Sequence, residues 1–263
     1  MNVLERNNVQ CIGHGQKVML FAHGFGCDQT MWRYVTPAFE EEYKIVLFDY
    51  VGFGKADTSV YSLERYSSLQ SYAVDILEIC DELNLGEVIF VGHSVSSMIG
   101  ALAAILEPSR FEKLIMIGPS ARYINDENYV GGFSQQTIED LLDTLDSDYL
   151  KWSETMAPVI MGRPDQPALG QELAQSFCRS HEQIAKDFAR ITFLSDNRDD
   201  LRHLKTETLI LQCAEDVIAP REVGEYIHRQ LPNSKLVYLQ ATGHCPNLSA
   251  PEETISAIKD FLN

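Results

Sequence analysis

The sequence predicts a doubly wound α/β fold, in which a mostly parallel sheet carries helices on both faces. Three observations predict it: apolar runs of strand length, helix-length segments between them, and one stretch in which the strands stop. Strands buried on both faces contain continuous apolar residues instead of alternating ones. Six runs of this kind occur, at residues 18–22, 44–48, 87–91, 113–117, 208–212 and 235–239.

Helical patterns with a period near 3.6 residues lie between several of these runs. Residues 72–83 place Ile76, Ile79 and Leu83 on one stripe, and another stripe follows Pro251 at the end of the chain. When strands alternate with helices, neighbouring parallel strands are joined by right-handed crossovers. The pattern therefore favours helices packed on both faces of the sheet.

The alternation stops between residues 122 and 200, where helical patterns occur without a convincing strand. Ser134 predicts the N-cap of one helix, and Ser180 with Gln183 has capping-box spacing before another. The simplest interpretation is an all-helical cap over one end of the sheet, and extra helices on the flank of the sheet are the alternative. The expected division is a core at 1–121, a cap at 122–200 and the rest of the core at 201–263.

Composition excludes several classes of protein. The 263 residues include 21 Lys and Arg against 38 Asp and Glu, a net charge of −17. An acidic protein does not bind nucleic acid or an anionic membrane surface by charge. No apolar run approaches the length of a membrane span, and the first ten residues are polar. We expect a cytoplasmic protein with reduced thiols and no metal site, because its cysteines are scattered without ligand spacing: Cys11, Cys27, Cys80, Cys178, Cys213 and Cys245.

The motif that carries chemistry is Gly-His-Ser-Val-Ser at residues 92–96, between the third apolar run and an apolar helix. A serine at such a strand-to-helix turn projects its hydroxyl from the sheet, while small neighbours let strand and helix approach each other. Ser96 occupies a position where glycine is usual. On these residues alone, Ser94 could equally be an ordinary helix N-cap.

A nucleophilic serine requires a base that takes its proton and a carboxylate that orients the base. Asp216 follows the fifth apolar run, with Glu215 as a rival acid, and His244 follows the sixth behind a glycine. Open α/β sheets place their sites at the carboxyl ends of the strands. The order along the chain therefore predicts that Ser94, Asp216 and His244 meet.

Residues 22–26, Ala-His-Gly-Phe-Gly, follow the first apolar run. Glycines there let the backbone turn so that an N–H group faces a tetrahedral oxyanion, and a second N–H comes from the residue after the nucleophile. We assign these two donors to the backbone amides of Phe25 and Val95. An ordinary turn at the end of a strand is the alternative for this segment.

With these residues placed, the chain resembles the α/β-hydrolases over essentially its whole length, because Ser, acid and His follow one another in the order of that family. Asp216 is preferred to Glu215 because the acid of the family commonly lies four residues before a proline. More narrowly, the chain is similar to the bacterial stress regulator RsbQ and to the plant karrikin and strigolactone receptors. The segments that carry this resemblance are 25–29, 47–52, 90–95, 129–133 and 243–246.

The resemblance implies a four-helix cap over a mostly apolar pocket without a cofactor. The pocket residues that it implies are Phe25, His93, Val95, Phe133, Trp152 and Phe193, with simple packing as the alternative for the aromatic ones. It implies a serine hydrolase of a small apolar ester or lactone, which acts in signalling. An RsbQ-like protein activates a PAS-domain phosphatase, RsbP, in a stress-response pathway that releases a sigma factor, and such a partner could dock on the acidic cap. The alternatives are a ligand sensor with slow turnover, a metabolic carboxylesterase, and a C–C hydrolase or haloperoxidase-like enzyme.

Overall fold

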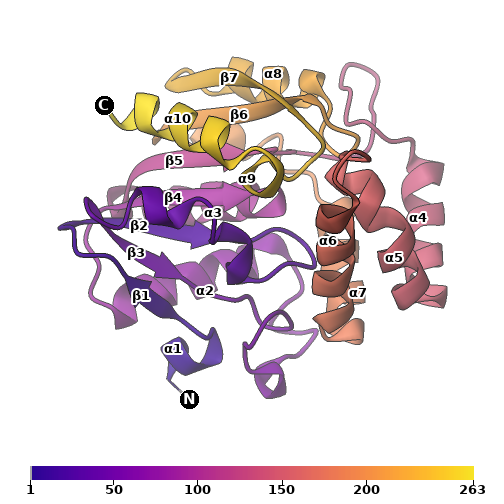
Figure 1. Cartoon of the computed structure of the whole chain (residues 1–263), viewed down its shortest axis with the longest axis horizontal. Coiled ribbons are helices and arrows are strands. Elements are labelled where there is room, and N and C mark those ends of the chain that lie inside the picture. Colours follow the sequence, from indigo (N-terminus) through magenta and orange to yellow (C-terminus); the bar gives the residue numbers. More distant parts are fainter. Residues whose placement is uncertain (1) are drawn as a thin grey trace.

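A computed structural model describes residues 2–263, which form a seven-stranded sheet with helices on both faces and a cluster of helices at one end (Figure 1). The strands lie in the order β1-β3-β2-β4-β5-β6-β7. All neighbouring strands are parallel except β1, which pairs antiparallel with β3. Their bounds are β1 Gln10–Ile12, β2 Lys17–Ala22, β3 Tyr43–Leu47, β4 Val88–His93, β5 Phe111–Ile117, β6 Glu207–Glu215 and β7 Ser234–Thr242.

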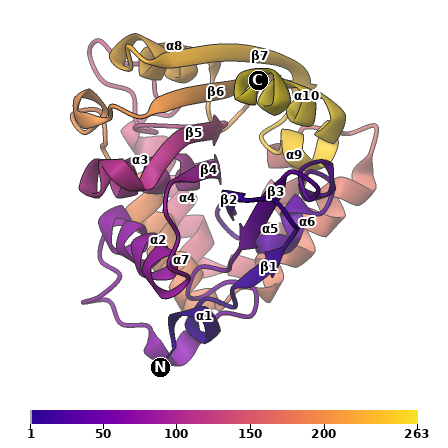
Figure 2. The same cartoon turned by 90° about the vertical axis from the view of Figure 1, so that its left-hand side faces the viewer.

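Helices α2, α3 and α8 cover one face of the sheet, and α10 covers the other (Figure 2). The α-helices are α1 Val3–Arg6, α2 Leu69–Glu82, α3 Val95–Leu106, α4 Gln135–Ser147, α5 Tyr149–Met161, α6 Pro167–Arg179, α7 Glu182–Phe193, α8 Arg221–Gln230, α9 Pro246–Ser249 and α10 Pro251–Leu262. Short 3₁₀ helices lie at Gln29–Trp32, Thr36–Ala38, Thr58–Val60, Pro108–Arg110 and Leu201–His203.

The predicted fold class is confirmed, and each of the six apolar runs overlaps one of the strands β2 to β7. Strand β1 was not predicted from the sequence. This strand is three residues long and all three are exposed, so it leaves no apolar run to detect. It pairs on one side only, at the edge of the sheet beside β3.

Helices α4 to α7 lie between β5 and β6 in the chain and gather beside one end of the sheet (Figure 1). We call these four helices the cap; the domain boundaries at 122 and 200 stay a prediction. Ser134 caps α4, because its hydroxyl accepts a hydrogen bond of 3.0 Å from the backbone N–H of Thr137.

The start of α7 differs from the prediction. The helix begins at Glu182 with His181 as its N-cap, so the capping box expected from Ser180 and Gln183 was wrong. The Ser180 hydroxyl points instead to backbone carbonyls, of Gly26 in the core and of the preceding turn of α6. This serine is nearly buried where the cap meets the core, and that contact takes the place of a capping role.

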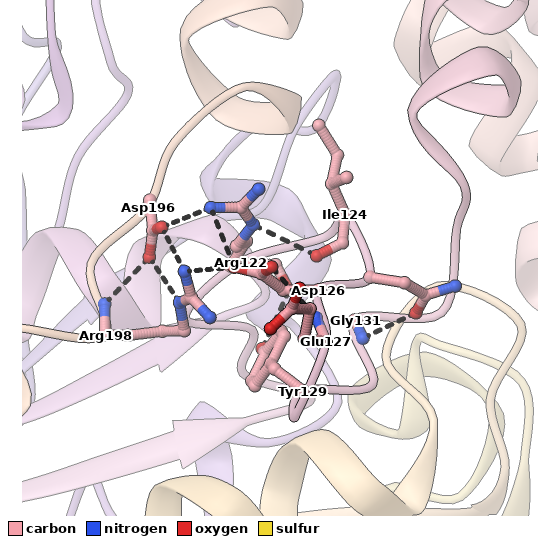
Figure 3. A network of polar contacts seen from close by, with 9 residues as sticks. Arg122, Ile124, Asp126, Glu127, Tyr129, Gly131, Asp196 and Arg198 are labelled. Atoms are coloured by element: carbon pink, nitrogen blue, oxygen red, sulfur yellow. Dashed lines mark hydrogen bonds and ion pairs between the residues drawn. The ribbon is translucent and has the colours of Figure 1, made fainter.

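The two segments that join the cap to the sheet are bound to each other by a hinge clasp, which consists of Arg122, Asp126, Asp196 and Arg198 (Figure 3). Arg122 and Asp196 form both an antiparallel backbone bridge and an ion pair. The Arg198 guanidinium lies 2.7 Å from Asp196 and 3.0 Å from Asp126, and it stacks over the ring of Tyr129. The clasp thus fixes the base of the cap.

Within the described part of the chain, no helix combines the length and apolar character that a membrane crossing requires. The six cysteines all carry free thiols, and four of them are buried. The apolar core is continuous from the sheet into the cap, because residues of α4, α5, α6 and α7 belong to the same buried cluster as the strands.

Candidate active site

Ser94 lies at the turn between β4 and α3 in a strained backbone conformation, with φ 56° and ψ −125°. Such a conformation costs on the order of 1–3 kcal/mol and is held by its surroundings. Gly92 makes the turn possible, since a Cβ there would lie 2.7 Å from the backbone of Ser96. The Ser96 hydroxyl donates to the carbonyl of His23 and lies 3.0 Å from the Tyr50 hydroxyl. Serine in place of the usual glycine therefore ties the helix to the loop after β2.

The three side chains that the sequence order predicts to meet form a hydrogen-bonded chain. His244 Nε2 lies 2.7 Å from Ser94 Oγ, and His244 Nδ1 lies 2.7 Å from Asp216 Oδ2. The other carboxylate oxygen, Oδ1, accepts bonds from the backbone N–H groups of Ile218 at 2.8 Å and Ala219 at 3.1 Å. An ionised carboxylate only accepts, so Nδ1 carries the imidazole proton and Nε2 is free to accept the serine proton.

Electrostatics favour the ionised form of Asp216. Burial alone would raise the pKa of Asp216, but the His244 imidazole and the two backbone donors outweigh it and hold this pKa below its ordinary value. The rival acid, Glu215, lies exposed at the end of β6. Of the two neighbouring carboxylates, the structure thus brings only Asp216 into contact with the histidine.

The cap holds the loop that carries His244. The backbone N–H of His244 donates to the carbonyl of Ile160 in α5 over 2.8 Å. Gly243 has φ +82°, and a Cβ at this position would lie 1.9 Å from the carbonyl oxygen of Met161. Only glycine permits such an approach, so the end of α5 packs directly against the histidine loop.

The two N–H groups predicted to face an oxyanion belong to the loop after β2 and to the first residue of α3. Within residues 2–263, neither the Phe25 nor the Val95 amide donates a hydrogen bond to another residue. Gly24 brings the loop close to the nucleophile, because a Cβ there would lie 2.4 Å from His93 Nδ1 and 3.4 Å from Ser94 Cβ. Unpaired N–H groups beside a nucleophile suit the charge of a tetrahedral intermediate.

His93 supports the histidine loop from the sheet side. Its Nε2 donates to the backbone carbonyl of His244 over 2.7 Å, and its Nδ1 has no partner among the described residues. Burial of the ring, reinforced by the neighbouring His244, lowers the pKa of His93 to about 3. The ring is therefore neutral at physiological pH.

A small, largely apolar cavity lies between Ser94 and the cap, with a volume of about 30 Å³. By the usual ~10–15 Å³ for one enclosed water, this is room for two or three water molecules. Four of the pocket residues expected from the sequence line it: Phe25, His93, Trp152 and Phe193. The ring of Phe25 packs against aromatic rings of the cap, including Trp152 at 5.9 Å between centroids.

Phe133 and Val95, also expected in the pocket, do not line this cavity. Phe133 is held away by two backbone hydrogen bonds, one to the carbonyl of Tyr123 and one from the N–H of Asn125. Its side chain is half-buried near the start of α4. Val95 is buried in the first turn of α3. Its predicted role as an oxyanion donor concerns its backbone N–H and not its side chain.

Several lining residues were missed by sequence reasoning, among them Tyr123, Phe177 and Thr192. Tyr123 is almost fully buried, and burial raises its pKa while the nearby Ser94 hydroxyl acts in the opposite direction. Cys27 and Cys245, expected to be reduced thiols, also border the cavity as buried thiols. The place of Tyr123 six residues after the end of β5, at the carboxyl edge of the sheet, is the one sequence signal that would have pointed to it.

No group of three or more His, Cys, Asp or Glu side chains in residues 2–263 is arranged to hold a metal ion. The site brings together a hydroxyl, an imidazole and a carboxylate. These groups suit nucleophilic attack on a carbonyl carbon, with proton transfer through the imidazole.

Comparisons with known proteins identify the family of the chain. Residues 19–257 match the model of a family described as the alpha/beta hydrolase family. The chain is 38% identical to strigolactone esterase D14 of Arabidopsis thaliana, covering 99% of this chain and 98% of that protein. It is 37% identical to karrikin insensitive 2 receptor CA of Petunia hybrida, covering 97% and 95% of the two chains.

A solved structure of a hydrolase from Oleispira antarctica superposes with a TM-score of 0.96 at 41% identity, covering 99% of this chain and 96% of that one. An esterase from Exiguobacterium antarcticum has a TM-score of 0.89 at 22% identity, over 97% and 94% of the chains, and supports the fold alone. The family match spans most of the chain, and the relatives align over nearly their full length. The protein is a member of the alpha/beta hydrolase family.

Proposed function

We propose that the protein is a serine hydrolase of small apolar esters or lactones, with Ser94 as nucleophile, His244 as base and Asp216 as the group that orients the base. The observation that carries this proposal is the continuous chain of two 2.7 Å contacts from Asp216 through His244 to Ser94, at the floor of a cavity. Relatives named as an esterase and as an enol-lactonase support the same class of reaction.

In the first half of the reaction, the Ser94 oxygen attacks the carbonyl carbon of the substrate and its proton passes to His244 Nε2. The negative oxygen of the tetrahedral intermediate accepts hydrogen bonds from the Phe25 and Val95 amides. The intermediate collapses, the bond to the alkoxy group breaks, and His244 returns the proton to the departing oxygen. The products are an acyl-serine and an alcohol, which stays attached when the substrate is a lactone.

In the second half, a water molecule attacks the acyl carbon and gives a proton to His244. Collapse of the second intermediate releases the carboxylic acid and returns the proton to Ser94. Asp216 stays ionised throughout and stabilises the imidazolium that forms twice in each cycle. Loss of one oxyanion donor costs on the order of 10²–10³ in rate in characterised enzymes, so both amides matter.

The cavity indicates the size and polarity of the acyl group. Aromatic and aliphatic side chains from loops at the edge of the sheet and from α5, α6 and α7 surround it, and its free volume is about 30 Å³. A short acyl chain fits the space beside Ser94 as it stands, and a longer one requires the cap helices to move apart. We therefore expect short-chain esters to be hydrolysed faster than long-chain ones.

Labelling with a serine-directed fluorophosphonate tests the nucleophile. The wild-type protein should be labelled, and Ser94→Ala should lose labelling completely along with ester hydrolysis. The matched control is Ser97→Ala, whose hydroxyl lies one helical turn away and donates to the carbonyl of Gly92 over 3.0 Å. Persistent labelling of Ser94→Ala would show that another residue is the nucleophile.

A second candidate function is a ligand sensor with slow turnover, which the 37% identity to a protein named as a receptor favours. In an RsbQ-like role, a PAS-domain phosphatase would dock on the cap, where residues 122–200 hold 15 acidic and seven basic residues. Pull-down of such a phosphatase from the same organism supports this role. Fast hydrolysis of simple esters, together with no bound phosphatase, would favour a metabolic carboxylesterase.

A further inference from the structure

Thr192 lines the active-site cavity and carries a buried hydroxyl without a partner among the described residues. It lies near the end of α7, on the side of the cavity opposite the sheet, and its side chain is 98% buried. Its hydroxyl oxygen makes no hydrogen bond to any residue of the described chain. Phe177 and Phe193, which line the same cavity, carry no polar group in their side chains.

Other helical hydroxyls of this protein behave differently. Thr144, Ser153 and Thr155 each donate to the backbone carbonyl four residues earlier, over 2.7, 2.7 and 2.8 Å. The same bond is open to Thr192 through the carbonyl of Phe188, yet Thr192 does not make it. A buried hydroxyl without a partner is unfavourable, and most such groups in proteins are paired. The partner of Thr192 is therefore expected to come from whatever fills the cavity.

We propose that Thr192 determines substrate specificity by hydrogen bonding to an oxygen of the acyl group other than the scissile carbonyl oxygen. This inference rests on the proposed hydrolase function. Ser94 and His244 reach the cavity from the carboxyl edge of the sheet and Thr192 belongs to α7 of the cap, so a substrate in the cavity lies between the reacting groups and a residue that carries an unpaired hydroxyl. The preferred substrates are then esters or lactones that carry an ether, hydroxyl or second carbonyl oxygen.

The physical basis of the preference is an asymmetry of hydrogen bonding. An alkyl chain in the cavity leaves the Thr192 hydroxyl without water and without a hydrogen-bond partner. A substrate oxygen at the same position accepts a hydrogen bond from this hydroxyl. Sites built to pair with a polar substrate atom discriminate against the analogue that lacks this atom. A neutral hydrogen bond of this kind corresponds to roughly fivefold to tenfold in kcat/KM.

The test compares two esters of nearly equal shape, p-nitrophenyl methoxyacetate and p-nitrophenyl butanoate, which differ by an ether oxygen in place of a methylene group. The quantity measured is the ratio of their kcat/KM values, in the wild-type protein and in Thr192→Val. Differences in intrinsic reactivity cancel, because the same two esters are used throughout. We expect the ratio to fall roughly fivefold to tenfold in Thr192→Val, since valine keeps the shape of threonine and removes only the hydroxyl.

Two further variants complete the experiment. Thr155→Val removes an exposed helical hydroxyl of the cap and should leave the ratio unchanged. Thr192→Ser keeps the hydroxyl and should retain most of the preference, while an equal loss in the Ser and Val variants would overturn the inference in favour of a role in shape. An unchanged ratio in Thr192→Val would overturn this inference alone. If the wild-type protein hydrolyses neither ester, the proposed function fails and the inference with it.

Discussion

The sheet and the cap face each other across the same cavity, but different interactions hold them in place. Strands β2, β4, β5 and β6 form continuous backbone ladders, and Ser94 and His244 follow the ends of two strands of this sheet. The cap joins the core through side-chain contacts, the hinge clasp and single backbone hydrogen bonds such as that from His244 to Ile160. The comparison indicates that the reacting groups belong to the rigid side of the cavity, and the shape of the pocket to the adjustable side.

The two sides meet at the histidine loop. The carbonyl of Ile160 in the cap accepts a bond from the His244 backbone N–H, and the carbonyl of His244 accepts one from His93 in the sheet. The backbone of His244 is thus held by one hydrogen bond from each region. We expect substitutions on the sheet side to have the largest effects and substitutions in the cap to have smaller ones.

The largest effect is expected from Asp216→Asn. Asparagine can still accept the two backbone N–H bonds that Asp216 Oδ1 receives, so the fold should persist. It cannot stabilise the imidazolium, and it allows the wrong tautomer of His244. The equivalent change in a serine protease lowers kcat about 10⁴-fold, and we expect a loss of similar size in hydrolysis of a p-nitrophenyl ester.

The neighbouring carboxylate provides the control for this experiment. Glu215→Gln removes an equal charge from the exposed residue next to Asp216 and should retain near wild-type turnover. If the two variants lost activity equally, the charge of the loop, and not contact with the histidine, would be the cause. That result would contradict the assignment of Asp216.

A smaller effect, on the pH dependence of stability, is expected when the buried ring of His93 is replaced. The pKa of His93 is about 3 in the folded protein, against 6.5 for an ordinary histidine. Below pH 6.5 the unfolded chain binds a proton at His93 that the folded protein does not bind. The free energy of unfolding therefore decreases as the pH is lowered from 6.5 to about 3. The loss from this residue is on the order of 4 kcal/mol over that range.

His93→Gln should therefore flatten the acid side of the pH profile, as measured by urea unfolding at a series of pH values. The flattening is partial, because burial also lowers the pKa of His23, whose neutral ring accepts a bond from the Tyr50 backbone. The exposed His228→Gln is the control and should leave the slope close to that of the wild-type protein. An unchanged slope in His93→Gln would show that His93 does not limit acid stability.

The same contrast between sheet and cap explains how far sequence reasoning reaches. The meeting of Ser94, Asp216 and His244 could be predicted, because parallel strands bring their carboxyl ends to one edge and the three residues follow three such ends. Their catalytic roles stay a prediction. Asp216 could be separated from Glu215 by resemblance alone, whereas the structure separates them by burial and contact.

The cap side could be predicted only in outline. Periodicity shows that a segment is helical, but not which face of it meets a cavity formed by four helices. Phe133 was expected in the pocket, yet backbone bonds to the Tyr123 segment turn it aside. Thr192 was missed because a threonine one residue before the end of a helix carries no local signal of an unpaired hydroxyl.

The smallest effect, on the cap, is expected from Arg198→Ala in the hinge clasp. The Arg198 guanidinium contacts Asp126 and Asp196 and stacks over Tyr129 at 5.0 Å, so its removal loosens both segments at the base of the cap (Figure 3). The side chain is 23% exposed, and water screens part of the attraction. Loss of this networked ion pair in Arg198→Ala should lower the melting temperature by about 2–4 °C, as measured by circular dichroism.

Arg202→Ala is the matched control, because Arg202 lies four residues further along the same segment but has a single ion pair, of 3.9 Å, with Asp199. The two side chains of that pair are 66% and 94% exposed, so its loss should leave the melting temperature within about 1 °C of the wild-type value. Equal shifts in the two variants would mean that the clasp contributes no more than any exposed pair. A larger shift in Arg198→Ala, with faster proteolysis near residue 126, would show that the clasp holds the base of the cap.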